Sequence, residues 1–229
     1  EAWKQSGKRI ILVTNAPRPA STVQAGLDAL GLSRSAYDAI TSSGEAGIAA
    51  LVDPPRAVGF LGTPEDSADL VAHGVLLGDD FDEVACTGLD ERRDEPAQYL
   101  QLLREWSARD VLLHCLNPDR EVIHLGRREA CGGALADLYE EMGGRVAWYG
   151  KPHGPIYDHA LRLAGNPPAR EVLAIGDGPL TDMVGAARAG IDALFISHGI
   201  HDGAPLPDDF ATRHQLGDWR PIATLADLA

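Results

Sequence analysis

Two aspartates follow a short apolar run in the stretch LAIGDGPLTDMVGAARAG, residues 173–190. Asp177 comes directly after the run, and Asp182 opens an Ala- and Gly-rich stretch that predicts a helix. Gly176 permits a tight turn at the strand end, so we expect Asp177 to point into a crevice. Two carboxylates there attract a hard cation such as Mg²⁺, which keeps several of its waters. The plainer alternative is that Asp177 only ends a strand and that Asp182, or Thr181, caps a helix.

Three further polar residues follow apolar runs elsewhere in the chain. Thr14 and Asn15 end the run KRIILVTNA (8–16), and Lys151 lies in the turn YGKP. A hydroxyl and backbone N–H groups bind phosphate oxygens, and a lysine adds a point charge. Ligands of open parallel sheets bind at the carboxyl ends of strands. We therefore expect these groups and the two aspartates to share one crevice, although each alone also fits an ordinary strand end or a solvated lysine.

The elements that position these residues alternate between strand and helix. Continuous apolar runs predict parallel strands that are covered on both faces. The strands are expected at 8–16, 56–62, 171–177 and 192–199, and the helices at about 20–30, 45–51, 154–164 and 180–189. This order is typical of an α/β fold with a doubly wound, Rossmann-like parallel sheet. The opening EAWKQSGK is interpreted as the last turns of a helix that stops at Gly7.

The middle of the chain carries a second α/β pattern. Strands are expected in DEVACTGL (82–89) and DVLLHCLNP (110–118), and helices over 95–108 and 128–143. Because this pattern separates the first strands from the last ones, residues 63–149 are interpreted as an inserted domain with its own small core. The remaining domain would then consist of residues 1–62 plus 150–229.

Charge and cysteine content narrow the possible functions. The net charge of -14 at pH 7 argues against a general nucleic-acid binder and against anionic membrane surfaces, but it is compatible with a small phosphorylated substrate. The three cysteines, Cys86, Cys115 and Cys131, form no CxxC pair. They predict reduced thiols in a cytoplasmic protein rather than a zinc site. No apolar run approaches about 18 residues, so no transmembrane helix is expected.

The segment SHGIHDG, residues 197–203, brings two histidines and an aspartate close together in sequence. His198, His201 and Asp202 suggest a metal site at first sight. We favour an ordinary loop over a metal site here. The loop follows a strand, and a contact with the substrate is the remaining alternative.

The motifs VTNA, GKP and IGDGPLTDM, in this order, resemble those of the haloacid dehalogenase superfamily of phosphohydrolases. The sequence is most similar to the branch, subfamily IIA, that includes ribonucleotide monophosphatases, 4-nitrophenylphosphatases and pyridoxal phosphate phosphatases. HCLNPDREVIHLG (114–126) resembles the insert motif of that branch, and the stretch from Ala130 to Leu161 resembles its run into the lysine motif. The likeness extends over nearly the whole chain.

The resemblance implies a role for each motif residue. Thr14 would bind the transferring phosphoryl group, with help from the backbone of Asn15. Lys151 would neutralise the charge of that group. Asp177 would bind Mg²⁺, and Asp182 would lie beside the ion, against its ligands or bound through a water.

The resemblance also implies a domain arrangement and a substrate class. Residues 63–149 would form a C2-type cap over the site, and Asn117, Pro118 and Asp119 would lie on its substrate-facing loop. The substrate would be a small phosphate ester such as a sugar phosphate or a nucleotide. A homodimer is a mild preference, since similar proteins dimerise through their caps.

One family motif is missing from these 229 residues. The family's nucleophile is an aspartate in an Asp-x-Asp motif upstream of the threonine, and only EAWKQSGKRII precedes Val13 here. The Asp80-Phe81-Asp82 sequence lies within the predicted insert and fits a solvated turn. We therefore expect a nucleophile upstream of Glu1.

Two alternatives to the phosphohydrolase remain open. The first is a catalytically inactive phosphate- or nucleotide-binding protein of the same fold, which the missing motif would favour. The second is a different doubly wound enzyme that uses a nucleotide. The absence of both GxGxxG and GxxxxGK[ST] counts against this second alternative.

Overall fold

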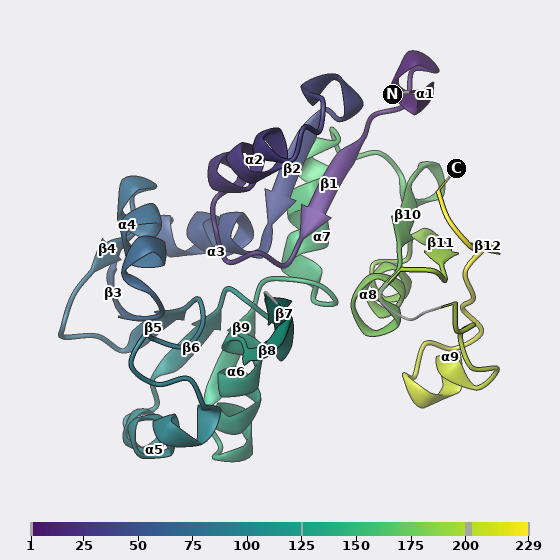
Figure 1. Cartoon of the computed structure of the whole chain (residues 1–229). Helices are drawn as coiled ribbons and strands as arrows, with labels where there is room; N and C mark the ends of the chain where they lie inside the picture. The colour runs from purple at the N-terminus through teal and green to yellow at the C-terminus, as the bar shows by residue number, and fades with distance from the viewer. Residues whose placement is uncertain (1, 125, 200–202, 229) are drawn as a thin grey trace. The chain divides into compact units, whose positions relative to one another are not determined.

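A computed structural model describes residues 2–124, 126–199 and 203–228 (Figure 1). The chain forms two compact units, Glu1–Gly150 and Lys151–Ala229, each built around parallel sheets. The α/β fold class is thereby confirmed. Within the described residues, no helix is both long and apolar enough to cross a membrane.

The first unit opens with a short helix and a two-stranded parallel sheet. Helix α1 (Ala2–Gln5) ends near Gly7, whose φ of 81° fits the predicted helix stop. Strand β1 (Ile11–Thr14) pairs in parallel with β2 (Ala39–Ser42), so that Thr14 lies opposite Ser42. The crossover between them contains α2 (Ala20–Ala29) and the turn η1 (Arg34–Ala36).

A five-stranded sheet forms the larger part of this unit. All of its strands are parallel, in the order β4-β3-β5-β6-β9. They are β3 (Ala57–Leu61), β4 (Leu76–Leu77), β5 (Glu83–Cys86), β6 (Leu112–Cys115) and β9 (Arg145–Trp148). The connecting helices are α3 (Ser43–Val52), α4 (Pro64–Ala72), η2 (Pro96–Tyr99), α5 (Leu100–Ala108) and α6 (Gly132–Glu141).

Alternating side chains divide the core of this sheet into two layers. Val84 and Leu113 face α5 and α6, where Leu103 and Tyr139 are fully buried. On the other face, Val58 and Ala85 pack in one cluster with residues of α3 and α4. Since successive residues of a strand point to opposite faces, the continuous apolar runs cover both layers.

The strand predicted at 56–62 is confirmed as β3, whose neighbours in the sheet are β4 and β5. A continuous apolar run indicates burial on both faces but does not specify the neighbouring strand, which depends on the crossovers. The division into 1–62 plus 150–229 and 63–149 stays a prediction.

One sequence prediction in this unit is wrong, the helix expected at 128–143. Residues Arg127–Ala130 instead form strand β8, which pairs antiparallel with β7 (Glu121–His124), and α6 begins only at Gly132. Cross-strand pairing overrides the weak helix preference of the sequence RREA.

The second unit contains a three-stranded parallel sheet. Its order is β10-β11-β12, from β10 (Leu173–Gly176), β11 (Asp192–Ile196) and β12 (Ala223–Leu225). Helix α7 (Gly154–Leu163) and the turn η3 (Ala169–Glu171) precede β10, and α9 (Phe210–Arg213) precedes β12. The predicted helix at 180–189 is a π-helical turn, η4 (Pro179–Met183), that continues into α8 (Val184–Arg188). Met183 and Phe195 are fully buried at the centre of this core.

Candidate active site

Asp182 is held at the carboxyl end of β10 by both of its carboxylate oxygens. Oδ2 accepts a hydrogen bond of 3.0 Å from the backbone N–H of Gly178, and Oδ1 accepts one of 2.9 Å from Nζ of Lys151. A Cβ on Gly176 would lie only 2.3 Å from Cγ of Asp182. The glycine therefore provides the space in which the carboxylate packs against the strand end.

Lys151 and Asp182 form a largely buried ion pair. Their side chains are 16% and 15% exposed. A charge-assisted pair of this kind fixes the position of the ammonium group and of the carboxylate. The sequence motifs GKP and GDGPLTD are thereby brought together in one unit.

Tyr157 of α7 contacts the π-helical turn that carries Asp182. The Tyr157 hydroxyl donates to the carbonyl oxygen of Thr181 at 3.3 Å and approaches that of Asp182 at 3.4 Å. A Cβ on Gly185 would meet the same hydroxyl oxygen at 2.1 Å. Burial raises the pKa of Tyr157 well above its ordinary value, so the phenol stays protonated as a donor. π-Helical turns are frequent at functional sites.

Asp177 lies at the same strand end. Its carboxylate packs against Gly199, where an added Cβ would meet Oδ2 at 2.0 Å. Asp177 and Asp182 thus both belong to the segment that follows β10 in the second unit. Gly176 and Gly199, on either side, leave room for these carboxylates.

The two carboxylates can be tested as ligands for Mg²⁺. Hard carboxylate oxygens suit this ion, which commonly takes one or two carboxylates and keeps several waters. Among the residues that the structure describes, no group of three or more His, Cys, Asp or Glu side chains gathers to hold a metal. Both oxygens of Asp182 already accept hydrogen bonds. Carboxylates of this kind are compatible with Mg²⁺, and the binding of a metal by Asp177 and Asp182 stays a prediction.

Strand β1 of the first unit ends at Thr14, and Asn15 follows it directly, so both lie at the strand end, as predicted. The Thr14 hydroxyl accepts a hydrogen bond of 3.3 Å from the backbone N–H of Ala16. Asn15 is buried, and its Nδ2 donates to Oδ1 of Asp119 at 2.8 Å. A Cβ on Gly150 would lie 2.6 Å from Oδ1 of Asn15. The strand end therefore contacts the loop that the sequence analysis placed near the substrate.

The loop after β1 is held by the N-terminus of α3. Ser42 accepts from the N–H of Glu45 at 2.9 Å and donates to the carbonyl of Arg18. A Cβ on Gly44 would meet the carbonyl oxygen of Pro17 at 2.3 Å. This close contact fixes the direction in which the chain leaves Thr14.

Asn117 and Pro118 follow β6 and pack against the start of α6. The carbonyl oxygen of Asn117 accepts from the Cys115 thiol at 3.3 Å and would lie 3.0 Å from a Cβ on Gly132. The carbonyl oxygen of Pro118 would lie 2.3 Å from a Cβ on Gly133. The two glycines allow the loop to approach the helix backbone.

A polar network that the sequence did not predict lies in the core of the first unit, around His114. His114 donates from Nε2 to Glu83 at 2.6 Å and bonds through Nδ1 to the Tyr149 hydroxyl at 2.8 Å. Glu83 also accepts from Arg56 at 2.8 Å. The only sequence signal was a histidine inside the apolar run DVLLHCL.

The histidines of the segment 197–203 and the three cysteines were also considered as candidate functional residues. His198 forms a 3.5 Å contact with Asp227, whereas His201 and Asp202 lie outside the described residues. The three cysteines are free and buried.

Comparison with known proteins identifies relatives over the whole chain. Residues 148–219 match the model of the HAD-hydrolase-like family. A hydrolase of the haloacid dehalogenase-like family from Brucella suis 1330 is 35% identical, with a TM-score of 0.82 over 99% of this chain and 85% of that one. No curated protein matches.

More distant solved structures share the fold. A p-nitrophenyl phosphatase from Archaeoglobus fulgidus is 20% identical, with a TM-score of 0.76 over 98% of this chain and 85% of that one. A 4-nitrophenylphosphatase from Thermotoga maritima is also 20% identical, with a TM-score of 0.73 over 98% and 83%. From the 35% identity over nearly its full length, together with the family model that covers Lys151, Asp177 and Asp182, this chain belongs to the haloacid dehalogenase-like family of hydrolases.

Proposed function

We propose that this hydrolase is a Mg²⁺-dependent phosphatase that acts on a small phosphate ester. The observation that carries the proposal is the buried pair of Lys151 and Asp182, beside Asp177 at the end of β10. A fixed ammonium next to carboxylates suits a reaction in which negative charge spreads over a phosphoryl group. The phosphatases with the same fold support this choice of reaction.

The chain's own residues take the following proposed roles. Lys151 donates to phosphoryl oxygens and to the developing negative charge. The Thr14 hydroxyl and the Asn15 backbone N–H bind the same kind of oxygen. Their proposed roles rest on the family resemblance and on their position at the end of β1.

Asp177 and Asp182 are the proposed holders of the metal. A bound Mg²⁺ supplies Lewis-acid stabilisation of phosphoryl oxygens. Asp182 also orients Lys151, since one carboxylate oxygen accepts directly from the ammonium.

The proposed route passes through an aspartyl phosphate. A carboxylate oxygen forms a bond to phosphorus while the bond to the ester oxygen breaks, and that oxygen leaves with a proton from a general acid. Water then adds to the acyl phosphate, which releases inorganic phosphate and restores the carboxylate. No Asp-x-Asp sequence stands directly ahead of Thr14 in the 229 residues, so we propose a nucleophile upstream of residue 1.

The loop of Asn117 and Pro118 is the proposed substrate-contacting part of the insert. Its support is the hydrogen bond between Asn15 and Asp119, which joins this loop to the end of β1. The substrate within the class of phosphate esters, a homodimer and a cytoplasmic location all stay predictions.

The proposal is tested by hydrolysis of p-nitrophenyl phosphate. The rate is measured with Mg²⁺ and with a chelator, on the 229-residue chain and on the product of the complete open reading frame. We expect Mg²⁺-dependent release of p-nitrophenol that Asp177→Asn abolishes, while exposed Asp192→Asn, on the same unit, leaves it unchanged. Tight phosphate binding without turnover in both proteins would instead favour the catalytically inactive phosphate-binding alternative.

A further inference from the structure

The five-stranded sheet has a topological switch point between β3 and β5. The chain leaves β3 for β4 on one side, and then returns to build β5, β6 and β9 on the other side. In doubly wound sheets, ligands bind outside the carboxyl ends of the strands where the two crossovers diverge. This geometry directs attention to the ends of β3 and β5.

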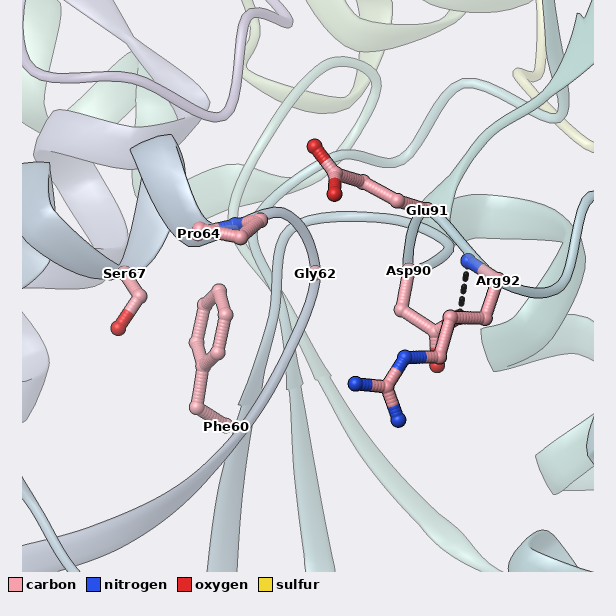
Figure 2. Close-up of a pocket in the computed structure, with 7 residues that line it drawn as sticks. All are labelled: Phe60, Gly62, Pro64, Ser67, Asp90, Glu91 and Arg92. Carbon is pink, nitrogen blue, oxygen red and sulfur yellow. Dashed lines mark hydrogen bonds between the residues drawn. The ribbon is translucent and has the colours of Figure 1, made fainter.

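A pocket of about 340 Å³ lies at this switch point. Phe60, Gly62, Pro64 and Ser67 line it from β3 and the start of α4, and residues 90–92 line it from the segment after β5. Figure 2 shows Phe60 and Ser67 on one side of the turn at Gly62, and Asp90 and Arg92 on the other. The volume is in the range of small-molecule sites.

The floor of the pocket is apolar and is shaped by Gly62. This residue has a φ of 157°, and an added Cβ would lie 1.9 Å from the Thr87 hydroxyl and 2.8 Å from Cζ of Phe60. Only glycine lets the chain turn so closely over the Phe60 ring. The ring of Pro64 follows at the first position of α4, so two flat apolar surfaces line the pocket.

Asp90, Glu91 and Arg92 are the charged residues that line the pocket, and Figure 2 shows the Glu91 carboxylate lying apart from the Arg92 guanidinium. Asp90 is already compensated: its Oδ2 pairs with Arg93, and its Oδ1 accepts from the N–H groups of Arg92 and Arg93 at 2.9 and 3.0 Å. In the part of the chain that the structure describes, the exposed Arg92 guanidinium has no ion pair. It is therefore available to a ligand anion.

The start of α4 offers few free backbone N–H groups to a phosphate. Pro64 has no N–H, and the N–H groups of Asp66 and Ser67 donate to the Thr63 hydroxyl and carbonyl at 3.3 and 3.1 Å. Glu65 adds an acidic side chain to the first turn. A doubly charged anion is disfavoured here, whereas a singly charged one has a partner in the guanidinium.

We propose that this pocket binds a small aromatic monocarboxylate. The aromatic ring packs on Phe60 and Pro64, and the carboxylate pairs with Arg92. Arginine suits a carboxylate because its planar fork can donate two parallel hydrogen bonds. This proposal uses residues of the first unit alone and does not rest on the proposed phosphatase function.

The test uses naphthoate and benzoate as probes, with benzamide as the uncharged analogue and inorganic phosphate as the competing anion. Binding to the whole chain is followed by calorimetry and by shifts of the amide resonances of residues 60–67 and 88–93. We expect saturable naphthoate binding that Arg92→Gln weakens by about tenfold or more, the loss of one charge-assisted contact. Arg104→Gln, an exposed arginine on α5, is the matched control and should leave binding unchanged.

A second variant separates the ring contact from the charge contact. Phe60→Leu keeps an apolar residue in the core but removes the flat ring, and should weaken naphthoate more than benzoate. Equal binding of benzamide and benzoate, displacement by phosphate, or an Arg92→Gln protein that binds as well as the parent would each overturn the proposal. So would the absence of any saturable shift in the named resonances.

Discussion

Asn15 donates a hydrogen bond of 2.8 Å to Asp119, a residue 104 positions further along the chain. The contact joins the end of β1 to the loop that follows β6. Gly150 makes it possible, because a side chain there would meet both Asn15 and Pro118 within 2.6 Å. Residues from three distant sequence motifs therefore meet at one point of the first unit.

Replacing Asp119 should destabilise this unit. Asp119→Ala removes the acceptor of a buried amide, and we expect a loss of about 1–3 kcal/mol in the free energy of unfolding, measured in urea. Asp137→Ala is the matched control, since Asp137 pairs with Arg120 on the surface and should cost at most about 1 kcal/mol. Equal losses of unfolding free energy in the two variants would show that the hydrogen bond to Asn15 stabilises the unit no more than a surface ion pair does.

Gly176 should tolerate no side chain. In Gly176→Ala the new Cβ would collide with Cγ of Asp182, so the carboxylate must move away from Lys151. We expect hydrolase activity to fall by about 100-fold or more, as when a catalytic group is displaced. Gly26→Ala, in the middle of α2 with open space around it, should leave activity unchanged and stability equal or slightly higher. A fully active Gly176→Ala protein would contradict the assigned packing.

The network around His114 should make stability depend on pH. Burial lowers the pKa of His114 below its ordinary 6.5, against the opposing hydrogen bond to Glu83. Burial alone would raise the pKa of Glu83, but the hydrogen bonds from Arg56 and His114 outweigh it and lower that pKa below its ordinary 4.5. The pKa values of His114 and Glu83 are both lower in the folded state than in the unfolded state. Each group's contribution to stability is therefore complete at a pH above its unfolded-state pKa, and it is lost as the pH falls through its folded-state pKa.

The measurement is the urea midpoint between about pH 8 and about pH 4. It should decrease from about pH 6.5 downward, with a second decrease below about pH 4.5. His114→Gln should flatten the first decrease and Glu83→Gln the second. His73→Gln, an exposed residue of the same unit, serves as the control. A parent protein whose midpoint is constant from about pH 7 to about pH 5 would refute the contribution of His114.

The sequence predicted the helices and strands better than the neighbours of each strand. The apolar periodicity identified α3, α7 and the strands β1, β3, β10 and β11, because burial on one or two faces leaves a clear pattern. The neighbours of β3 could not be predicted, since its residues look the same beside either sheet. The three residues of β12 are exposed and belong to no apolar run, so no local pattern predicted this strand.

For the candidate site, the spacing of the motifs predicted which residues lie together, but the sequence did not predict the contacts between their side chains. The motifs brought Lys151 and Asp182 into one hypothesis because both follow strand ends. The direct ion pair depends on a π-helical turn and on the absence of a Cβ at Gly176, and neither has a distinct sequence pattern. The His114 network was missed because a polar residue inside an apolar strand can be satisfied only by partners that are remote in sequence.

Lys151 should be required for activity through its charge and through its partner. Lys151→Met keeps the length of the side chain but leaves the Asp182 carboxylate without the ammonium. We expect kcat on p-nitrophenyl phosphate to fall by about 100-fold or more, because the lost interaction is strongest in the transition state. The free energy of unfolding should also fall, by about 1–3 kcal/mol, since a largely buried carboxylate loses a charged donor.

The double variant Lys151→Met with Asp182→Asn separates these two effects. Neutralising the carboxylate removes the uncompensated charge, so stability should return toward that of the parent while activity stays low. Lys151→Arg keeps the charge but not the compact ammonium, and should recover stability more fully than activity. If Lys151→Met hydrolysed the ester as fast as the parent, the ammonium would have no part in the reaction, and the proposed phosphatase site at the end of β10 would be wrong.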